Sequence, residues 1–296
     1  MSAATKTAVG PFTVRPLLWE ELSLLDPVRK DFGFVTGLHQ LETLWKTDPG
    51  GIFGAITETG ELFGACVAPV VGTDTHYLSM IAVLPQYRKC GIGKKLMEST
   101  MVYAEKRNVY LFCPPNQVPF YRDKWKFQLY YRSLHVLTPG VPDVTQLKLV
   151  HSGVTINSFS ADLLPLIIKY DESVFGVSRK KLVELELSEP EGTIAVATHN
   201  PLKVCGYGFI TGDIYGRCIV RSVFADSQDI AELILGWLLR ECSQVQTTGV
   251  SIILRPSTEE DTYFQKKLKM TKAADLKCLF RWPLPQGDFT KIFVLS

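Results

Sequence analysis

The chain has 296 residues, of which 46% are hydrophobic and 21% charged, and its formal net charge at pH 7 is +2. This composition is typical of a globular protein that buries a core, and the length suits one large domain or two ordinary ones. The nearly balanced charge argues against general attraction to nucleic acid or an anionic membrane, and no apolar run approaches the roughly 20 residues of a membrane-spanning helix. Residues 1–10 contain no apolar signal-peptide core, so we expect a short flexible tail there.

The seven cysteines lie far apart, and none has the Cys-x-x-Cys or Cys/His spacing of a metal site. The pattern therefore predicts no metal and no disulfide framework. We expect each cysteine to be a small buried apolar residue of a protein in a reducing compartment, the cytoplasm.

The first half of the chain alternates strand and helix patterns. A strand is predicted at 12–17, helices at 18–32 and 38–45, and strands at 51–57, 61–71 and 76–84. A basic turn with two glycines comes next. After it we expect a helix that runs to about residue 107, a strand at 109–113, a helix at 116–125 and a strand at 126–137. One face of the first of these helices is predicted to contain Ile92, Leu96, Met97, Met101, Val102 and Ala104.

The second half repeats this order. Gly64 in ELFGACVA corresponds to Gly206 in KVCGYGFI, an offset of 142 residues (206 − 64), and Pro119–Phe127 resembles Thr262–Met270 at an offset of 143 (262 − 119). A nearly constant offset over separate segments favours duplication over two unrelated α+β domains. We therefore predict a tail at 1–10, domains at 11–138 and 153–296, and a linker at 139–152 that begins in a stretch with two prolines.

The repeat fails at the turn. Where the first half has PQYRKCGIGKKL, the second has ADSQDIAEL, without either glycine or the basic pair, and Tyr121 corresponds to Phe264. A chemical site in the first half would therefore be absent from the second.

The turn itself has the features of an anion site. The first amides of a helix lack partners within the helix, and the helix dipole places partial positive charge there. We therefore expect this turn to form an amide-lined cup for a phosphate or pyrophosphate, with glycines that let the ligand approach the main chain. Its predicted residues are Arg88, Lys89, Cys90, Gly91, Ile92, Gly93 and Lys94. The spacing fits neither a P-loop nor a dinucleotide fingerprint.

A longer pattern surrounds the two glycines and reads Val83-x-Pro85-x-Tyr87-Arg88-x-x-Gly91-x-Gly93-x-x-Leu96. Placed after a strand and at the start of a helix, it resembles the acetyl-CoA motif of the GNAT superfamily of N-acyltransferases. The resemblance covers most of residues 11–138 and extends more loosely to the second half. It implies a mixed α/β (α+β) fold of tandem GNAT-like domains, the second one degenerate. Each would have a mostly antiparallel central sheet, flanking helices and a splayed central strand pair.

The resemblance also implies a cofactor site. The turn would hold the pyrophosphate of coenzyme A, and the backbone of Ile81, Ala82 and Val83 would pair with the pantetheine arm as an added strand does. Asn116 is a further candidate contact, although it lies closer to Tyr121 than the family's asparagine usually does.

An amine must lose a proton before it attacks the thioester. The inward positions where related enzymes often place Glu or His carry Tyr77 and Ser79, whereas His76 faces the other way on a regular strand. These two residues could relay the proton through water, a base could come from elsewhere, or the neutral amine fraction could suffice. Tyr121 resembles the family tyrosine that protonates the leaving thiolate, but the usual YxxxGF ending reads YRDKWKF, without the glycine.

Candidate substrate contacts are Phe32, Phe34, His39 and Tyr130. Ordinary packing explains the three aromatic side chains about as well, and a solvated helix face explains His39 better than catalysis does. The resemblance implies an acetyl-CoA-dependent N-acetyltransferase of a small primary amine, with an arylalkylamine as one candidate, and no nucleic-acid or membrane partner. The alternatives are a protein N-terminal or lysine acetyltransferase and a non-catalytic acyl-CoA sensor or scaffold.

Overall fold

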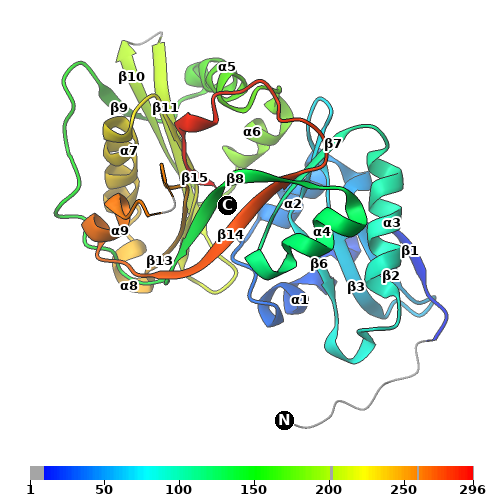
Figure 1. Cartoon of the computed structure of the whole chain (residues 1–296). Coiled ribbons are helices and arrows are strands. Elements are labelled where there is room, and N and C mark those ends of the chain that lie inside the picture. Colours follow the sequence, from blue (N-terminus) through cyan, green and yellow to red (C-terminus); the bar gives the residue numbers. More distant parts are fainter. Residues whose placement is uncertain (1–9, 201–202, 259, 296) are drawn as a thin grey trace. The chain divides into compact units, whose positions relative to one another are not determined.

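The computed structural model describes residues 10–200, 203–258 and 260–295, and for residues 131 and 132 only the backbone. Residues 1–9 of the expected tail therefore lie outside the description. The chain divides into two compact units, one of Met1–Phe34 and Leu41–Leu111, the other of Val35–Gln40 and Phe112–Ser296 (Figure 1).

The first unit has two groups of strands. An antiparallel sheet has the order β1-β2-β3-β6, from β1 (Thr13–Pro16), β2 (Ile52–Ile56), β3 (Leu62–Val67) and β6 (Met80–Val83). The other group has the order β4-β5-β7, from β4 (Val70–Gly72), β5 (Thr75–Leu78) and β7 (Asn108–Cys113), of which the first four residues of β7 belong to this unit. The helices are η1 (Trp19–Leu24), α1 (Leu25–Asp31), α2 (Gln40–Thr47), whose first residue belongs to the other unit, and α3 (Ile92–Ala104), with short turns η2 (Pro49–Gly51) and η3 (Pro85–Tyr87).

The strand predicted at 76–84 is interrupted at Ser79. Residues before the break pair in parallel with β7, from Thr75↔Asn108 to Leu78↔Leu111, whereas residues after it pair antiparallel with β3, from Val67↔Met80 to Gly64↔Val83. One continuous segment thus changes partners, and β6 leaves the neighbour that β5 keeps. This is the predicted splayed strand pair.

Helix α3 packs its apolar face on β2, β3 and β6. Ile92, Leu96 and Met97 are buried as predicted, but Val102 is 75% exposed, so its assignment to this face was wrong. A helix turns about 100° per residue, which places Val102 about 160° from Thr100, a fully buried residue at the middle of this face.

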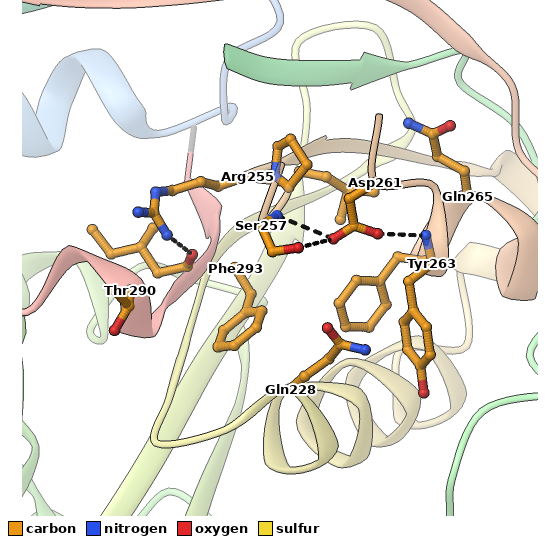
Figure 2. Close-up of a pocket in the computed structure, with 12 residues that line it drawn as sticks. Gln228, Arg255, Ser257, Asp261, Tyr263, Gln265, Thr290 and Phe293 are labelled. Carbon is orange, nitrogen blue, oxygen red and sulfur yellow. Dashed lines mark hydrogen bonds between the residues drawn. The ribbon is translucent and has the colours of Figure 1, made fainter. Parts of the chain in front are cut away.

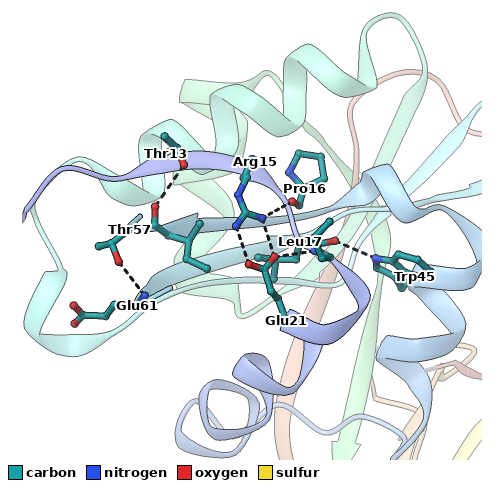
Figure 3. Close-up of polar contacts among 10 residues, drawn as sticks. Thr13, Arg15, Pro16, Leu17, Glu21, Trp45, Thr57 and Glu61 are labelled. Carbon is teal, nitrogen blue, oxygen red and sulfur yellow. Dashed lines mark hydrogen bonds and ion pairs between the residues drawn. The ribbon is translucent and has the colours of Figure 1, made fainter. Parts of the chain in front are cut away.

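Strand β1 is held by its neighbours' polar groups (Figure 3). The Arg15 guanidinium donates to both carboxylate oxygens of Glu21 at 2.8 and 2.7 Å, and the Trp45 indole donates to the Leu17 carbonyl at 3.1 Å. The hydrogen bond from Arg15 lowers the pKa of Glu21 to about 2. These contacts fix η1 and α2 to the edge of the sheet.

The second unit contains a larger sheet of order β14-β8-β13-β15-β12-β11-β10-β9. Its strands are β8 (Gln128–Leu137), β9 (Thr155–Ser158), β10 (Thr193–Asn200), β11 (Lys203–Gly212), β12 (Cys218–Ala225), β13 (Val250–Leu254), β14 (Lys272–Phe280) and β15 (Ile292–Leu295). Its helices are α4 (Val118–Trp125), α5 (Leu164–Phe175), α6 (Lys180–Glu186), α7 (Gln228–Glu241), α8 (Val245–Thr248) and α9 (Tyr263–Leu268), with short turns η4 (Pro115–Gln117), η5 (Ala161–Leu163) and η6 (Phe289–Lys291). Helix α7 covers β10, β11 and β12, and its apolar side chains form the main core with them.

Residues 112–138 group with the second unit because β8 pairs antiparallel with both β14 and β13. The expected linker also contacts this unit, since Gly140 bridges Val250 and the Asp143 amide donates to the Leu268 carbonyl. The compact units are therefore not cut at the linker. The predicted domain limits at 138 and 153 describe where the duplicated sequence segments end and begin, and they stay a prediction.

The two halves share local details at the predicted offsets. A Cβ on Gly64 would lie 2.5 Å from the Ala82 carbonyl oxygen, and one on Gly206 would lie 2.7 Å from that of Phe224, 142 residues further on. Helices α4 and α9 both end at a left-handed lysine, Lys126 with φ 63° and Lys269 with φ 51°. These matching backbone constraints at matching positions add structural support for duplication.

Candidate functional site

The turn after β6 exposes backbone and positive charge. Gly91 is the N-cap of α3 with φ +81°, no side chain among the described residues caps it, and a Cβ there would meet nothing within 4 Å. Lys89, with φ 63°, is a second left-handed residue, and the stretch from Arg88 to Gly91 is exposed. The amides at the start of α3 thus face the side from which an anion could approach.

Neighbouring side chains hold this turn in place. The Tyr87 hydroxyl donates to the Glu61 carboxylate, and the Tyr87 ring packs on Phe63 with centroids 4.2 Å apart. The Arg88 Nε donates to the Val83 carbonyl oxygen at 3.1 Å, and the guanidinium carbon lies 4.9 Å from the centre of the Phe32 ring. The turn is therefore fixed from both β3 and the segment that follows α1.

Other basic groups surround the start of α3. Lys94 forms an exposed pair with Glu98 at 3.6 Å, and the Lys95 ammonium lies 4.6 Å from the centre of the Phe12 ring. An exposed ion pair such as Lys94–Glu98 adds little to the free energy of unfolding. The main contribution of Lys94 and Lys95 is therefore positive charge near the start of α3.

The backbone of β6 is paired on one edge. The Leu84 amide donates to the Phe63 carbonyl at 3.0 Å, in register with the β3–β6 ladder. Because hydrogen-bonded pairs alternate along antiparallel strands, Ala82 directs its N–H and C=O toward β3, whereas Ile81 and Val83 direct theirs toward the other edge. Of the three predicted backbone ligands, two thus have the orientation needed to meet an added strand.

The residues at the strand break lie next to this edge. Tyr77 and Ser79 are both half-buried. The Tyr77 ring stacks on the Tyr110 ring, with their centroids 4.8 Å apart. The Ser79 amide donates to the Val67 carbonyl at 2.9 Å. His76 is fully buried, with Nδ1 2.9 Å from the Ala68 carbonyl oxygen, and desolvation lowers its pKa. A histidine enclosed in this way has a structural role.

Tyr121 belongs to α4 of the second unit and is 3% exposed, between the rings of Phe120 and Phe127. The glycine missing after this tyrosine has no structural consequence, because Lys126 takes the left-handed conformation that ends α4. Asn116 is an exposed residue of the short turn that precedes the helix.

The four predicted substrate contacts have different surroundings. Phe32 and Phe34 are half-buried and stack on each other at 6.3 Å, with Phe32 beneath Arg88 of the turn. His39 belongs to the second unit and precedes α2 by one residue, although the sequence placed it inside this helix. Tyr130 packs against Phe280 and Phe289, in an aromatic cluster of the second unit.

In the second half, the helix start and the strand splay that correspond to those of the first half are both occupied by the protein itself. Ser227 is the N-cap of α7, and its hydroxyl accepts the Ile230 amide at 3.3 Å. Strands β12 and β13 pair at their starts and then separate, and β15 lies between them, with Val294 opposite both Val223 and Leu254. The chain's own strand thus occupies the splay. The sequence analysis did not predict this insertion. The four residues of β15, Ile292–Leu295, indicate a strand, but they do not indicate which strands it pairs with.

A cavity of about 310 Å³ remains in this part of the second unit (Figure 2). Gln228 of α7, Arg255 after β13, and Tyr263 of α9 line it, together with Phe293 of β15. Two of its charged groups bond to the protein: Arg255 donates to the Ile292 carbonyl at 3.1 Å, and Asp261 accepts from the Ser257 and Tyr263 amides. The site therefore offers no amide cup like that of the first half.

Neither metal nor membrane features stand out. Among the described residues, no three His, Cys, Asp or Glu side chains gather closely enough to hold a metal ion. No helix in the described part of the chain combines the length and apolar character that crossing a lipid bilayer requires.

Part of the chain matches a known protein family. Residues 15–125 match the acetyltransferase (GNAT) family, whose members typically transfer acetyl from acetyl-CoA to amines of small molecules or proteins. No curated protein sequence matches the chain at a significant level.

Solved structures share the fold over nearly the whole chain. A putative acetyltransferase from Pyrococcus horikoshii is 16% identical, with a TM-score of 0.75, and the match covers 98% of this chain and 96% of that one. A GCN5-related N-acetyltransferase from Sphaerobacter thermophilus is 13% identical, with a TM-score of 0.60 and coverage of 91% and 95%. A tandem GNAT protein from the clavulanic acid biosynthesis pathway is 11% identical, with a TM-score of 0.64 and coverage of 92% and 99%. Residues 15–125 are therefore an acetyltransferase (GNAT) family domain, and the whole chain has the fold of tandem GNAT proteins.

Proposed function

We propose that this protein is an acetyl-CoA-dependent N-acetyltransferase of a small primary amine, with an arylalkylamine as the leading candidate. One observation carries the proposal: the uncapped, exposed start of α3 adjoins a strand, β6, whose outer edge has no strand partner among the described residues of the first unit. An amide cup for a pyrophosphate next to a free edge for an extended amide chain matches the two parts of coenzyme A.

The residues of the first unit fit this ligand. The amides from Cys90 to Lys94 would receive the pyrophosphate, with Arg88 and Lys89 adding charge, and the backbone of Ile81 and Val83 would pair with the pantetheine arm. When bound, acetyl-CoA supplies the activated acetyl group. The contact of Arg88 Nε with the Val83 carbonyl holds the charged rim at the end of the same strand.

The proton of the attacking amine would pass through water held by Tyr77 and Ser79. Both side chains are half-buried at the strand break, whereas His76 is enclosed and bonded to Ala68. We assign Tyr121 as the acid that protonates the leaving thiolate, since a phenol can donate at this step.

The choice of amine rests on the aromatic pair beside the turn. Phe32 and Phe34 stack on each other and remain half-buried, so an apolar or aromatic amine could extend the stack. Tyr130 contacts other aromatic rings and is assigned to packing. No acidic tract in the sequence suggests a basic protein tail as substrate.

The test is release of free thiol from acetyl-CoA in the presence of arylalkylamines, polyamines, amino sugars and peptides. Turnover confined to arylalkylamines or related apolar amines supports the proposal. Turnover confined to peptides would replace it with protein acetylation, and tight coenzyme A binding without any turnover would replace it with a sensor.

Glycine variants test the cofactor site separately. Gly91→Val should weaken coenzyme A binding by about tenfold or more, or roughly 1.4 kcal/mol, measured by calorimetry. Gly60→Val is the matched control, because Gly60 also has a positive φ, of +86°, and open space around its Cβ position. Gly93→Ala is a milder probe, since its new Cβ would contact only a Val83 methyl at 3.5 Å. Normal affinity in both turn variants would refute the assignment.

A further inference from the structure

Two free thiols of the second unit lie in contact. The sulfur of Cys218, the first residue of β12, is 3.5 Å from that of Cys242, the C-cap of α7. Of the seven cysteines, all described as free, these are the two for which the structure gives a sulfur–sulfur contact. The pair lies at the opposite end of α7 from Ser227, away from the cavity of Figure 2.

The two thiols have unequal surroundings. Cys218 is fully buried, whereas Cys242 is half-buried and within reach of a small reagent. The hydrogen bond from Cys218, together with those from the Gln244 and Val245 amides, lowers the pKa of Cys242 to about 7. The same contact and burial raise the pKa of Cys218. The lowered pKa favours the thiolate of Cys242, which is the reactive form.

The local geometry permits a bond between the sulfurs. A disulfide has an S–S distance near 2.05 Å, so the two atoms must approach by about 1.5 Å. Each residue lies at the end of its element, where Cys242 has already left helical geometry with ψ 92°. Side-chain rotation and a small adjustment of this end can supply the movement without disturbing the core of the sheet.

We propose that Cys218 and Cys242 are a peroxide-sensitive pair that forms a reversible intramolecular disulfide. The Cys242 thiolate attacks hydrogen peroxide, the O–O bond breaks, and the sulfenic acid of Cys242 and one water form after proton uptake. The sulfur of Cys218 then attacks that of Cys242, its proton leaves with the displaced hydroxyl as a second water, and the S–S bond forms. Two thiols are oxidised and one peroxide is reduced to two waters.

The disulfide would join the start of β12 to the end of α7. These two elements contribute to the same core cluster, and the bond would close the intervening chain into a loop. Because a cross-link restricts the unfolded chain, the oxidised protein should melt at a higher temperature, by about 4 °C or more.

Peptide mapping tests the bond in the wild-type protein. The reduced full-length chain is treated with stoichiometric hydrogen peroxide, alkylated under denaturing conditions and digested without reductant. The expected product links the tryptic peptide CIVR, residues 218–221, to the peptide that begins at Glu241, and dithiothreitol separates them. Cys218→Ser and Cys242→Ser should each abolish the link and the rise in melting temperature. Cys205→Ser, which removes another buried thiol of the same unit, should change neither.

Other oxidation products would overturn the proposal. These include sulfinic acid at Cys242 with Cys218 still alkylated, a link between either residue and exposed Cys90, and no oxidation of either thiol under conditions that oxidise Cys90.

Discussion

At the residue scale, Tyr121 and Phe264 test the proposed chemistry. They occupy corresponding positions of α4 and α9, both are buried, and they differ by one hydroxyl group. If Tyr121 is the acid, Tyr121→Phe should lower kcat by about 10²-fold with little change in KM, because general acid catalysis contributes on this order. Steady-state kinetics measure this, and Tyr110→Phe is the control, since Tyr110 is equally buried at 3% exposure. Equal kcat for Tyr121→Phe and wild type would remove Tyr121 from the mechanism.

His76 makes a prediction about pH. Burial lowers its pKa from 6.5, so the neutral ring is favoured in the folded protein. At pH values between the lowered pKa and 6.5, the unfolded chain binds more protons than the folded one. The contribution of His76 to the free energy of unfolding is therefore complete above about pH 6.5 and is lost as the pH falls through the pKa of the folded protein. Urea unfolding as a function of pH should therefore show declining stability below this point. His76→Asn keeps a donor for the Ala68 carbonyl and should flatten the decline, and an unchanged slope would contradict the argument.

At the element scale, α3 and α7 begin in opposite ways. Gly91 leaves the amides of α3 available to a ligand, whereas the Ser227 hydroxyl accepts an amide of α7. Ser227→Ala should therefore lower the free energy of unfolding by about 1 kcal/mol, as for other lost N-caps, measured by chemical denaturation. Ser227→Asp keeps an acceptor and should restore most of the loss, and Ser243→Ala, at an exposed serine beyond α7, should have no effect. Equal stability of Ser227→Ala and wild type would show that this cap contributes nothing.

At the scale of the whole molecule, two similar halves should give one cofactor site. The start of α7 is capped, and β15 occupies the space between β12 and β13, so the second half lacks both the amide cup and the free strand edge. Calorimetry should find one coenzyme A per chain, and Gly91→Val should weaken that single event. Two binding events, or a full-strength event in the variant, would show that the second half binds the cofactor as well.

Local sequence determined much of this protein. The strand and helix order, the glycine turn and the repeat offset follow from side-chain period, glycine conformation and residue identity, all of which act over a few residues. Gly91 at the start of α3 and the paired Gly64 and Gly206 are found where the pattern places them. The degenerate second domain was also predictable, because the loss of glycines and basic residues is visible in the letters.

Tertiary structure alone decided the rest. The splay itself was expected, but its position at Ser79 was not. The stacking of Arg88 on Phe32, the insertion of β15 and the contact of Cys218 with Cys242 each join segments whose pairing no local pattern specifies. The sequence predicted that each cysteine is free and buried. This was wrong for Cys90, which is exposed, and for Cys242, which is half-buried, and packing brings Cys242 into contact with Cys218. The reason is physical: periodicity reports which face of an element is buried, whereas its partner is chosen by the packing of the whole chain.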